Sequence, residues 1–103
     1  MSESTAKIEI VHPFIRYERE FVITEGKTTL SKLMELVLTD AEKHGRYSTM
    51  AGRRIDRLKG CVVVLGGDQV GYIDKSGFVL VDNQYDSVEH SDVFIIMVPI
   101  TGG

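Results

Sequence analysis

Residues 28–45, which read TTLSKLMELVLTDAEKHG, carry the strongest helical signal in the 103-residue chain. The apolar residues that recur there at helical spacing are Leu30, Leu33, Met34, Val37 and Ala41. Thr28 or Thr29 can supply the N-cap oxygen, and Gly45 can end the helix in the left-handed conformation. The stretch therefore predicts one amphipathic helix, which must cover the apolar face of a sheet formed by the rest of the chain.

Short apolar or alternating segments lie on both sides of this helix. The strands expected from them are residues 7–12, 20–24, 61–65, 70–73, 78–81 and 93–98. Pro13 limits the first strand and Pro99 stops the last. Turns are expected at residues 25–27 and at 66–68, where the second contains Gly66 and Gly67 and is interpreted as a hairpin turn.

The order of these segments constrains the topology. The two strands before the helix can form a hairpin, and the helix can then serve a right-handed crossover that makes the first and last strands parallel at the centre. We expect an α+β fold of the β-grasp, or ubiquitin-like, type, with a mixed sheet of four to five strands and one main helix on one face. Other small α+β arrangements fit the same periodicity. The length suits a single domain, residues 1–103, with a flexible C-terminal tail at residues 99–103.

Residues 46–60 are predicted to form a long basic loop, with a short helical turn near Ile55. Its cations are Arg46, Arg53, Arg54, Arg57 and Lys59. A loop of this length is often functional, but a tolerated insertion fits equally. Arg53, Arg54 and Arg57 could grip phosphates, yet the net charge of −3 and the absence of aromatic residues between these three make nucleic acid an unlikely main partner.

The end of the chain has the opposite charge. No Lys or Arg follows Lys75, whereas Asp82, Asp86, Glu89 and Asp92 precede the tail. Two solvated surfaces would explain this distribution, and so would an acidic patch near the tail that attracts a basic partner.

Several other classes of site and location are disfavoured. Cys61, the single cysteine, lies in an apolar run and is expected to be a buried structural thiol rather than a reactive one. His12, His44 and His90 have no metal-ligand spacing, so no metal site and no intrinsically bound cofactor are expected. The N-terminus does not resemble a signal peptide, and no apolar run reaches membrane-spanning length. These features predict a cytoplasmic protein without a membrane partner.

The chain closes with Pro99-Ile100-Thr101-Gly102-Gly103, directly after a core strand. Pro99 restricts its own backbone and biases Val98 toward extended structure, so the chain should leave the sheet outward. Residues 100–103 can span roughly 13 Å when extended. Gly102 and Gly103 lack a Cβ and can thread a narrow channel in another protein. A terminal carboxylate has a poor leaving group, so a partner must activate it with ATP before a sulfur or amine can attack. A glycine tail without a role is the alternative.

Residues 92–103 resemble the C-terminal motif of the ubiquitin-like sulfur carriers. This group includes the molybdopterin synthase small subunit, the thiamine sulfur carrier and the ubiquitin-related modifier. The matching positions are the acidic Asp92, the apolar Phe94 and Ile96, then Pro99, Ile100, Thr101, Gly102 and Gly103. The strand and turn at residues 61–68 also fit the group. Ser91 stands where the group usually has glycine, the turn at residues 66–67 lacks the usual asparagine, and residues 46–60 add length, which leaves the subfamily open.

The resemblance implies a carrier that is a cosubstrate and not an enzyme. Gly103 would be adenylated by a ubiquitin-activating-type enzyme that uses ATP, and would then hold sulfur as a thiocarboxylate. Gly102 would thread the tail, and Pro99, Ile100 and Thr101 would contact the activating enzyme. The sulfur would pass to a cofactor precursor or a transfer RNA base, which makes a synthase large subunit or a tRNA-thiolation enzyme a further partner.

Three alternatives remain open from the sequence. The first is a protein modifier joined to lysines of target proteins through Gly103. The second is a synthase small subunit whose tail inserts into a larger subunit. The third is an interaction domain whose tail is idle.

Overall fold

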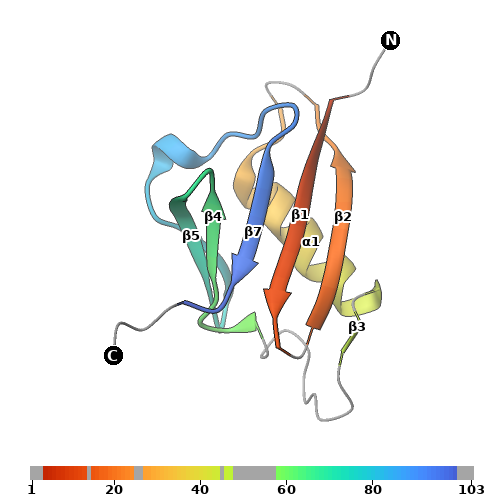
Figure 1. The fold of residues 1–103 in the computed structure, drawn as a ribbon. Helices are drawn as coiled ribbons and strands as arrows, with labels where there is room; N and C mark the ends of the chain where they lie inside the picture. Colours follow the sequence, from red (N-terminus) through yellow and green to blue (C-terminus); the bar gives the residue numbers. More distant parts are fainter. Residues whose placement is uncertain (1–3, 14, 25–26, 45, 48–57, 100–103) are drawn as a thin grey trace.

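The computed structural model describes most of the chain (Figure 1). The described residues are 4–13, 15–24, 27–44, 46–47 and 58–99. The elements are β1 (Thr5–His12), β2 (Ile15–Val22), α1 (Leu30–His44), β3 (Arg46–Tyr47), β4 (Val62–Leu65), β5 (Asp68–Asp74), β6 (Gly77–Leu80), the 3₁₀ turn η1 (Asn83–Tyr85) and β7 (Val93–Met97). The predicted loop at residues 46–60 lies largely outside these ranges, including the helical turn expected near Ile55.

The strands form one mixed sheet with α1 on a single face (Figure 1). Their order is β3-β2-β1-β7-β4-β5-β6, and β1 pairs with β7 in parallel while the other neighbours are antiparallel. The prediction of an α+β fold with the first and last strands parallel at the centre is therefore confirmed. Among the described residues, no helix is long and apolar enough to cross a membrane.

The predicted count of four to five strands is wrong. The described residues form six strands of four or more residues, and the two-residue β3 pairs with the start of β2. The sequence missed β3 because two residues carry no period of their own, so only the neighbouring edge of β2 defines it. Both strands of the β5–β6 hairpin also belong to the sheet, since β5 pairs with β4 as well as with β6.

Strand β2 begins five residues before its predicted start. His12 pairs with Ile15 across a tight turn that contains Pro13, so β1 ends where Pro13 was expected to limit it. Ile15 and Tyr17 point into the core while Arg16 and Glu18 are exposed. Buried and exposed residues therefore alternate along β2. Arg19 takes a position on the helix side of the sheet but is exposed, so the hydrophobic period is interrupted there in the sequence.

Helix α1 begins as the sequence predicts. The Thr29 hydroxyl accepts a hydrogen bond from the Lys32 N–H at 3.2 Å, so Thr29 is the N-cap, and Thr28 instead bonds back to Thr24. Asp86 adds a second contact, because its Oδ1 accepts from the Ser31 N–H at 2.9 Å and from the Ser31 hydroxyl at 3.0 Å. A carboxylate at a helix N-terminus is favoured by the helix dipole, so Asp86 joins the segment after β6 to the helix.

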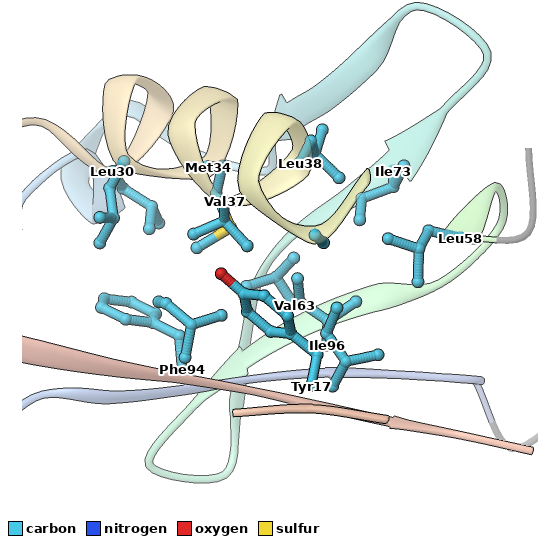
Figure 2. Close-up of a cluster of buried hydrophobic side chains, with 14 of the residues drawn as sticks. Tyr17, Leu30, Met34, Val37, Leu38, Leu58, Val63, Ile73, Phe94 and Ile96 are labelled. Carbon is cyan, nitrogen blue, oxygen red and sulfur yellow. The ribbon is translucent and has the colours of Figure 1, made fainter. Parts of the chain in front are cut away.

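The core lies between α1 and the covered face of the sheet (Figure 2). The side chains of Phe94, Ile96 and Tyr17 point from the sheet toward Met34 and Val37 of the helix. Burial of a large apolar side chain contributes about 1.5–3 kcal/mol, so this interface provides the main favourable term. Cys61 is also buried here, as the sequence predicts, and desolvation raises the pKa of its thiol.

A polar clamp joins the flank of α1 to β2. The Tyr17 hydroxyl donates to Asp40 Oδ2 at 2.5 Å, and Arg19 Nη1 donates to Oδ1 and Oδ2 of the same carboxylate at 2.8 and 2.9 Å. Charge-assisted bonds of this kind are short and directional. The clamp therefore sets which flank of the helix faces β2.

Candidate functional site

The tail residues divide into those the structure describes and those it does not. Pro99 is exposed directly after β7, and Val98 is also exposed. Ile100, Thr101, Gly102 and Gly103 lie outside the described residues, so the expectation of a flexible tail remains a prediction. Because β7 is held between β1 and β4, the base of the tail is anchored in the centre of the sheet.

The last residue of β7 belongs to a row of apolar side chains on the sheet face opposite α1. Strand register places Val11, Met97, Val62, Tyr72 and Val79 opposite one another across five strands. Neighbouring side chains in such a row are in contact range. We call these five residues the apolar row.

The apolar row is open to solvent in the described structure. Val11 is 50% exposed and Tyr72 is 39% exposed, whereas Met97, Val62 and Val79 are half-buried. A contiguous apolar surface of this kind commonly marks a contact site for another molecule. The row passes through Met97, two residues before Pro99, so it lies at the base of the tail.

A second row of side chains lies beside the apolar row on the same face. It is two residues away along β1, β7 and β4, on the side further from the tail. It consists of Glu9, Ile95, Val64 and Gln69, in that order across four strands. The apolar character is thus concentrated on β4 and β7 and gives way to carboxylates on β1 and β2, where Glu18 faces Glu9. The open face therefore has an apolar part at the tail and an acidic part beside it.

The sequence itself carries a signal for this surface, namely two strands that are apolar on both faces. Residues 62–65 and 93–97 are apolar at both even and odd positions, and such runs are typical of strands covered on both faces. Only one helix is predicted, and one helix covers only one face. The combination indicates that the sheet has a second apolar face, which no helix of the described residues covers.

Of the two explanations for the acidic residues after Lys75, an acidic patch near the tail does not fit the positions of Asp86 and Asp92. Asp92 precedes β7 and Pro99 follows it, so five strand residues, about 17 Å, separate the two ends. Asp92 Oδ2 accepts from the Glu89 N–H, and Asp86 is bound to Ser31. Sequence proximity misled here because a strand carries its two ends to opposite edges of the sheet.

The charges at the tail end are mainly basic. Arg16 pairs with Val11 at the end of the apolar row. Lys75 lies in the β5–β6 turn, and Lys59 precedes Gly60, whose N–H bonds to the Ile73 carbonyl. Asp74 in the same turn accepts hydrogen bonds from the N–H and the hydroxyl of Ser76, both at 2.7 Å. These bonds hold the pKa of the Asp74 carboxyl below its usual value.

The turn that leads into β7 explains the departure at Ser91. Ser91 has a φ of 71°, in the left-handed region that favours glycine, and its N–H donates to the Thr5 carbonyl. A non-glycine residue there costs about 1–2 kcal/mol. The backbone thus adopts at Ser91 a conformation for which glycine is suited, although the residue is serine.

The remaining predicted features have structural roles. Gly66 and Gly67 have φ values of 60° and 90° and join β4 to β5, which confirms the hairpin turn. His90 Nδ1 accepts a hydrogen bond from the Thr5 N–H at 3.2 Å. Within the described ranges, no group of three or more His, Cys, Asp or Glu residues could hold a metal ion.

No family model matches the chain, and neither the curated proteins nor the solved structures include a significant match to it.

Proposed function

We propose that the protein is a ubiquitin-like sulfur carrier with a β-grasp fold, whose Gly103 carboxylate is activated by a partner enzyme and converted to a thiocarboxylate. The observation that carries the proposal is the placement of the tail base. The residues that resemble the sulfur-carrier motif include the central strand β7, and the exposed Val98 and Pro99 come directly after it. The order of strands and helix is consistent with a β-grasp sheet.

The proposed reaction requires a tail that can reach into the partner's active site and a rigid strand from which the tail extends. In the partner, a Gly103 carboxylate oxygen attacks the α-phosphorus of ATP, pyrophosphate leaves, and an acyl-adenylate remains. Hydrosulfide from the sulfur donor then attacks the carbonyl carbon, the bond to AMP breaks, and the Gly103 thiocarboxylate remains. The protein contributes the acyl group and its positioning, and β7, held on both sides, fixes the point from which the tail extends.

The apolar row supports the same proposal because it lies at the tail base. A partner that packs on Val11, Met97 and Tyr72 would hold the domain while residues 98–103 enter its active site. Burial of apolar surface supplies binding energy that the tail itself lacks. The basic residues at this end, including Arg16, favour an acidic rim on the activating enzyme.

The test is reconstitution with the ubiquitin-activating-type enzymes of the source cell, ATP and a sulfur donor. Intact-mass spectrometry should show one oxygen replaced by sulfur, located in the C-terminal peptide. Protein isolated from its own cells should end at Gly103 or be trimmed to it. A natural product that extends past Gly103 without trimming, or the lack of any adenylate with these enzymes, would refute the proposal.

Two matched variants test the role of the apolar row. Val11 and Val81 are 50% and 52% exposed, but only Val11 belongs to the row. Val11→Asp should raise the KM for the carrier in adenylation by about tenfold or more, an effect of about 1.4 kcal/mol. Val81→Asp should leave it unchanged. Equal effects would show that the row is not the contact surface.

Conjugation to lysines is the alternative outcome of the same activation, because an amine can attack the adenylate or a thioester derived from it. Digests of whole-cell protein distinguish the two functions. A carrier leaves the thiocarboxylate on the free protein, whereas a modifier leaves Gly102-Gly103 remnants on target lysines.

A further inference from the structure

Strand β2 forms an outer edge of the sheet along most of its length. In the described part of the chain, β3 pairs only with Ile15 and Arg16, which leaves residues 17–22 beyond its reach. An edge strand presents N–H and C=O groups that can pair with another chain. The question is which residues offer those groups and what kind of chain they would accept.

Hydrogen bonding to β1 identifies the outward groups. The Ile23 N–H donates to the Ser4 carbonyl at 2.8 Å, so Ile23 faces β1. Since alternate residues of an antiparallel strand face the same neighbour, Phe21 also faces β1. The backbone groups of Glu18, Glu20 and Val22 therefore point away from the sheet, and their side chains lie on the open face.

The two sides of this edge differ in chemistry. On the helix side, the clamp through Asp40 turns one flank of α1 toward β2, and Leu36 lies one turn earlier on that flank. Leu36 is 59% exposed, and Phe21 is half-buried on the same side of β2. The helix side of this edge is thus apolar at Phe21 and Leu36, one turn of α1 before the clamp.

The open side of the edge is acidic. Glu9, Glu18 and Glu20 lie around Lys7, whose Nζ lies 2.8 Å from Glu18, while the exposed Arg16 lies on the same face at the other end of β2. Glu9 and Glu18 are directly opposite each other, an arrangement that like charges disfavour. Additional positive charge at this place would relieve the repulsion.

We propose that the free edge of β2 binds an extended segment of another protein, in which apolar residues alternate with Lys or Arg, as an added strand. The apolar residues lie beside Phe21 and Leu36, and the basic residues lie beside Glu18 and Glu20. A second copy of β2 fits less well, because its own glutamates would face the same carboxylates. This surface is separate from the apolar row and the tail, so it is independent of the proposed sulfur chemistry.

The probe is the peptide acetyl-Lys-Val-Lys-Val-Lys-Val-Lys-amide, titrated into the ¹⁵N-labelled full chain. NMR should show shifts along residues 17–22 and slowed hydrogen exchange at the amides of Glu18, Glu20 and Val22. A peptide with Glu in place of Lys should bind about tenfold more weakly or worse. Glu20→Lys should reverse this preference.

Two N-methylated peptides keep the test specific for strand addition. Methyl groups on the lysine amides block the hydrogen bonds of an antiparallel strand, and methyl groups on the valine amides block those of a parallel one. One of these peptides, and only one, should lose binding. Binding of both, equal affinity for the Lys and Glu peptides, or shifts confined to β6 or the apolar row would overturn the proposal. The absence of any shift at millimolar peptide would do the same, and would identify the glutamates as charges that prevent edge pairing.

Discussion

The two faces of β7 have nearly the same composition and opposite roles. Phe94 and Ile96 point toward α1 and are completely buried, while Val93, Ile95 and Met97 point to the open face, where Val93 is 41% exposed. A strand that only stabilised the domain would alternate apolar and polar residues. The difference indicates that the covered face maintains the fold, and it fits the proposal that the open face contacts a partner.

The largest expected effect is the difference in the free energy of unfolding between alanine variants of two neighbouring isoleucines in β7. Ile96→Ala should lower the free energy of unfolding by about 2–5 kcal/mol, because it leaves a cavity in the core. Ile95→Ala should cost about 1 kcal/mol, since the open face can rehydrate. Chemical denaturation followed by fluorescence or circular dichroism measures both. Equal losses would mean that the open face is as important for folding as the core.

The same pair separates stability from recognition. At a temperature where both variants are folded, Ile95→Ala, beside the apolar row on the open face, should weaken binding to the proposed activating enzyme, and Ile96→Ala should not. The opposite result would place the contact surface elsewhere.

Gly71 tests how closely the covered face is packed at β5 and β6. A Cβ at this position would lie 2.3 Å from the Phe78 ring and 2.7 Å from the Val79 carbonyl oxygen. Gly71→Ala should therefore destabilise the protein by about 1–3 kcal/mol. In a Phe78→Leu background the penalty should shrink but persist, because the backbone oxygen remains. An Ala variant as stable as the parent would show that β6 can shift freely.

Ser91 tests the turn that positions β7. Ser91→Gly removes the cost of a positive φ but adds chain entropy to the unfolded state, so the change should be small, at most about 1 kcal/mol and stabilising. Ser91→Val should destabilise, because a β-branched residue is strongly disfavoured at this φ. Thermal unfolding of the three proteins checks the order Gly, Ser, Val. A valine variant as stable as the parent would contradict the strain.

The smallest expected differences between the covered and open faces of the sheet are in the pKa values of Cys61 and Lys7. Burial raises the pKa of the Cys61 thiol on the covered side, whereas the hydrogen bond and charge of Glu18 raise the pKa of Lys7 on the open side. In both cases the folded protein holds its proton to higher pH than the unfolded chain, so these contributions are present below the unfolded pKa and are lost as pH rises through the folded one.

Glu18→Gln should lower the pKa of Lys7 toward 10.5, as measured by NMR titration of the side chain. Salt should have a similar effect on Lys7 and little on Cys61, because the lysine is exposed to screening and the thiol is not. Native Cys61 should react slowly with thiol reagents and quickly after denaturation. Fast reaction in the native state would contradict its burial.

The long elements were predictable because each has a period or apolar run within itself. The helix with its Thr29 cap, the glycine turn after β4 and the strand before Pro99 all follow from local rules. The first half of β2 was missed because Arg19, which bonds Asp40 on the helix, occupies a position on the covered face. β3 was missed because its pairing partner, and not its two residues, defines it.

The candidate site was predicted only in part. The tail residues follow from the motif at residues 92–103, and their chemistry follows from a bare terminal carboxylate. The apolar row could not be read from the sequence, because its members come from β1, β7, β4, β5 and β6 and meet only through strand register. For the same reason the sequence could not decide whether its acidic residues form a patch near the tail.

Local chemistry alone determined the identity of the helix, the turn conformations, the burial of Cys61 and the resemblance of the tail to a carrier motif. Each depends on residues within one turn or one strand, where sterics and periodicity are sufficient. The tertiary structure decided what the tail base adjoins, which face of β7 is open and where the edge of β2 is left unpaired in the described chain. These depend on contacts between distant residues, and the free energy of those contacts is defined only once the sheet has set its register.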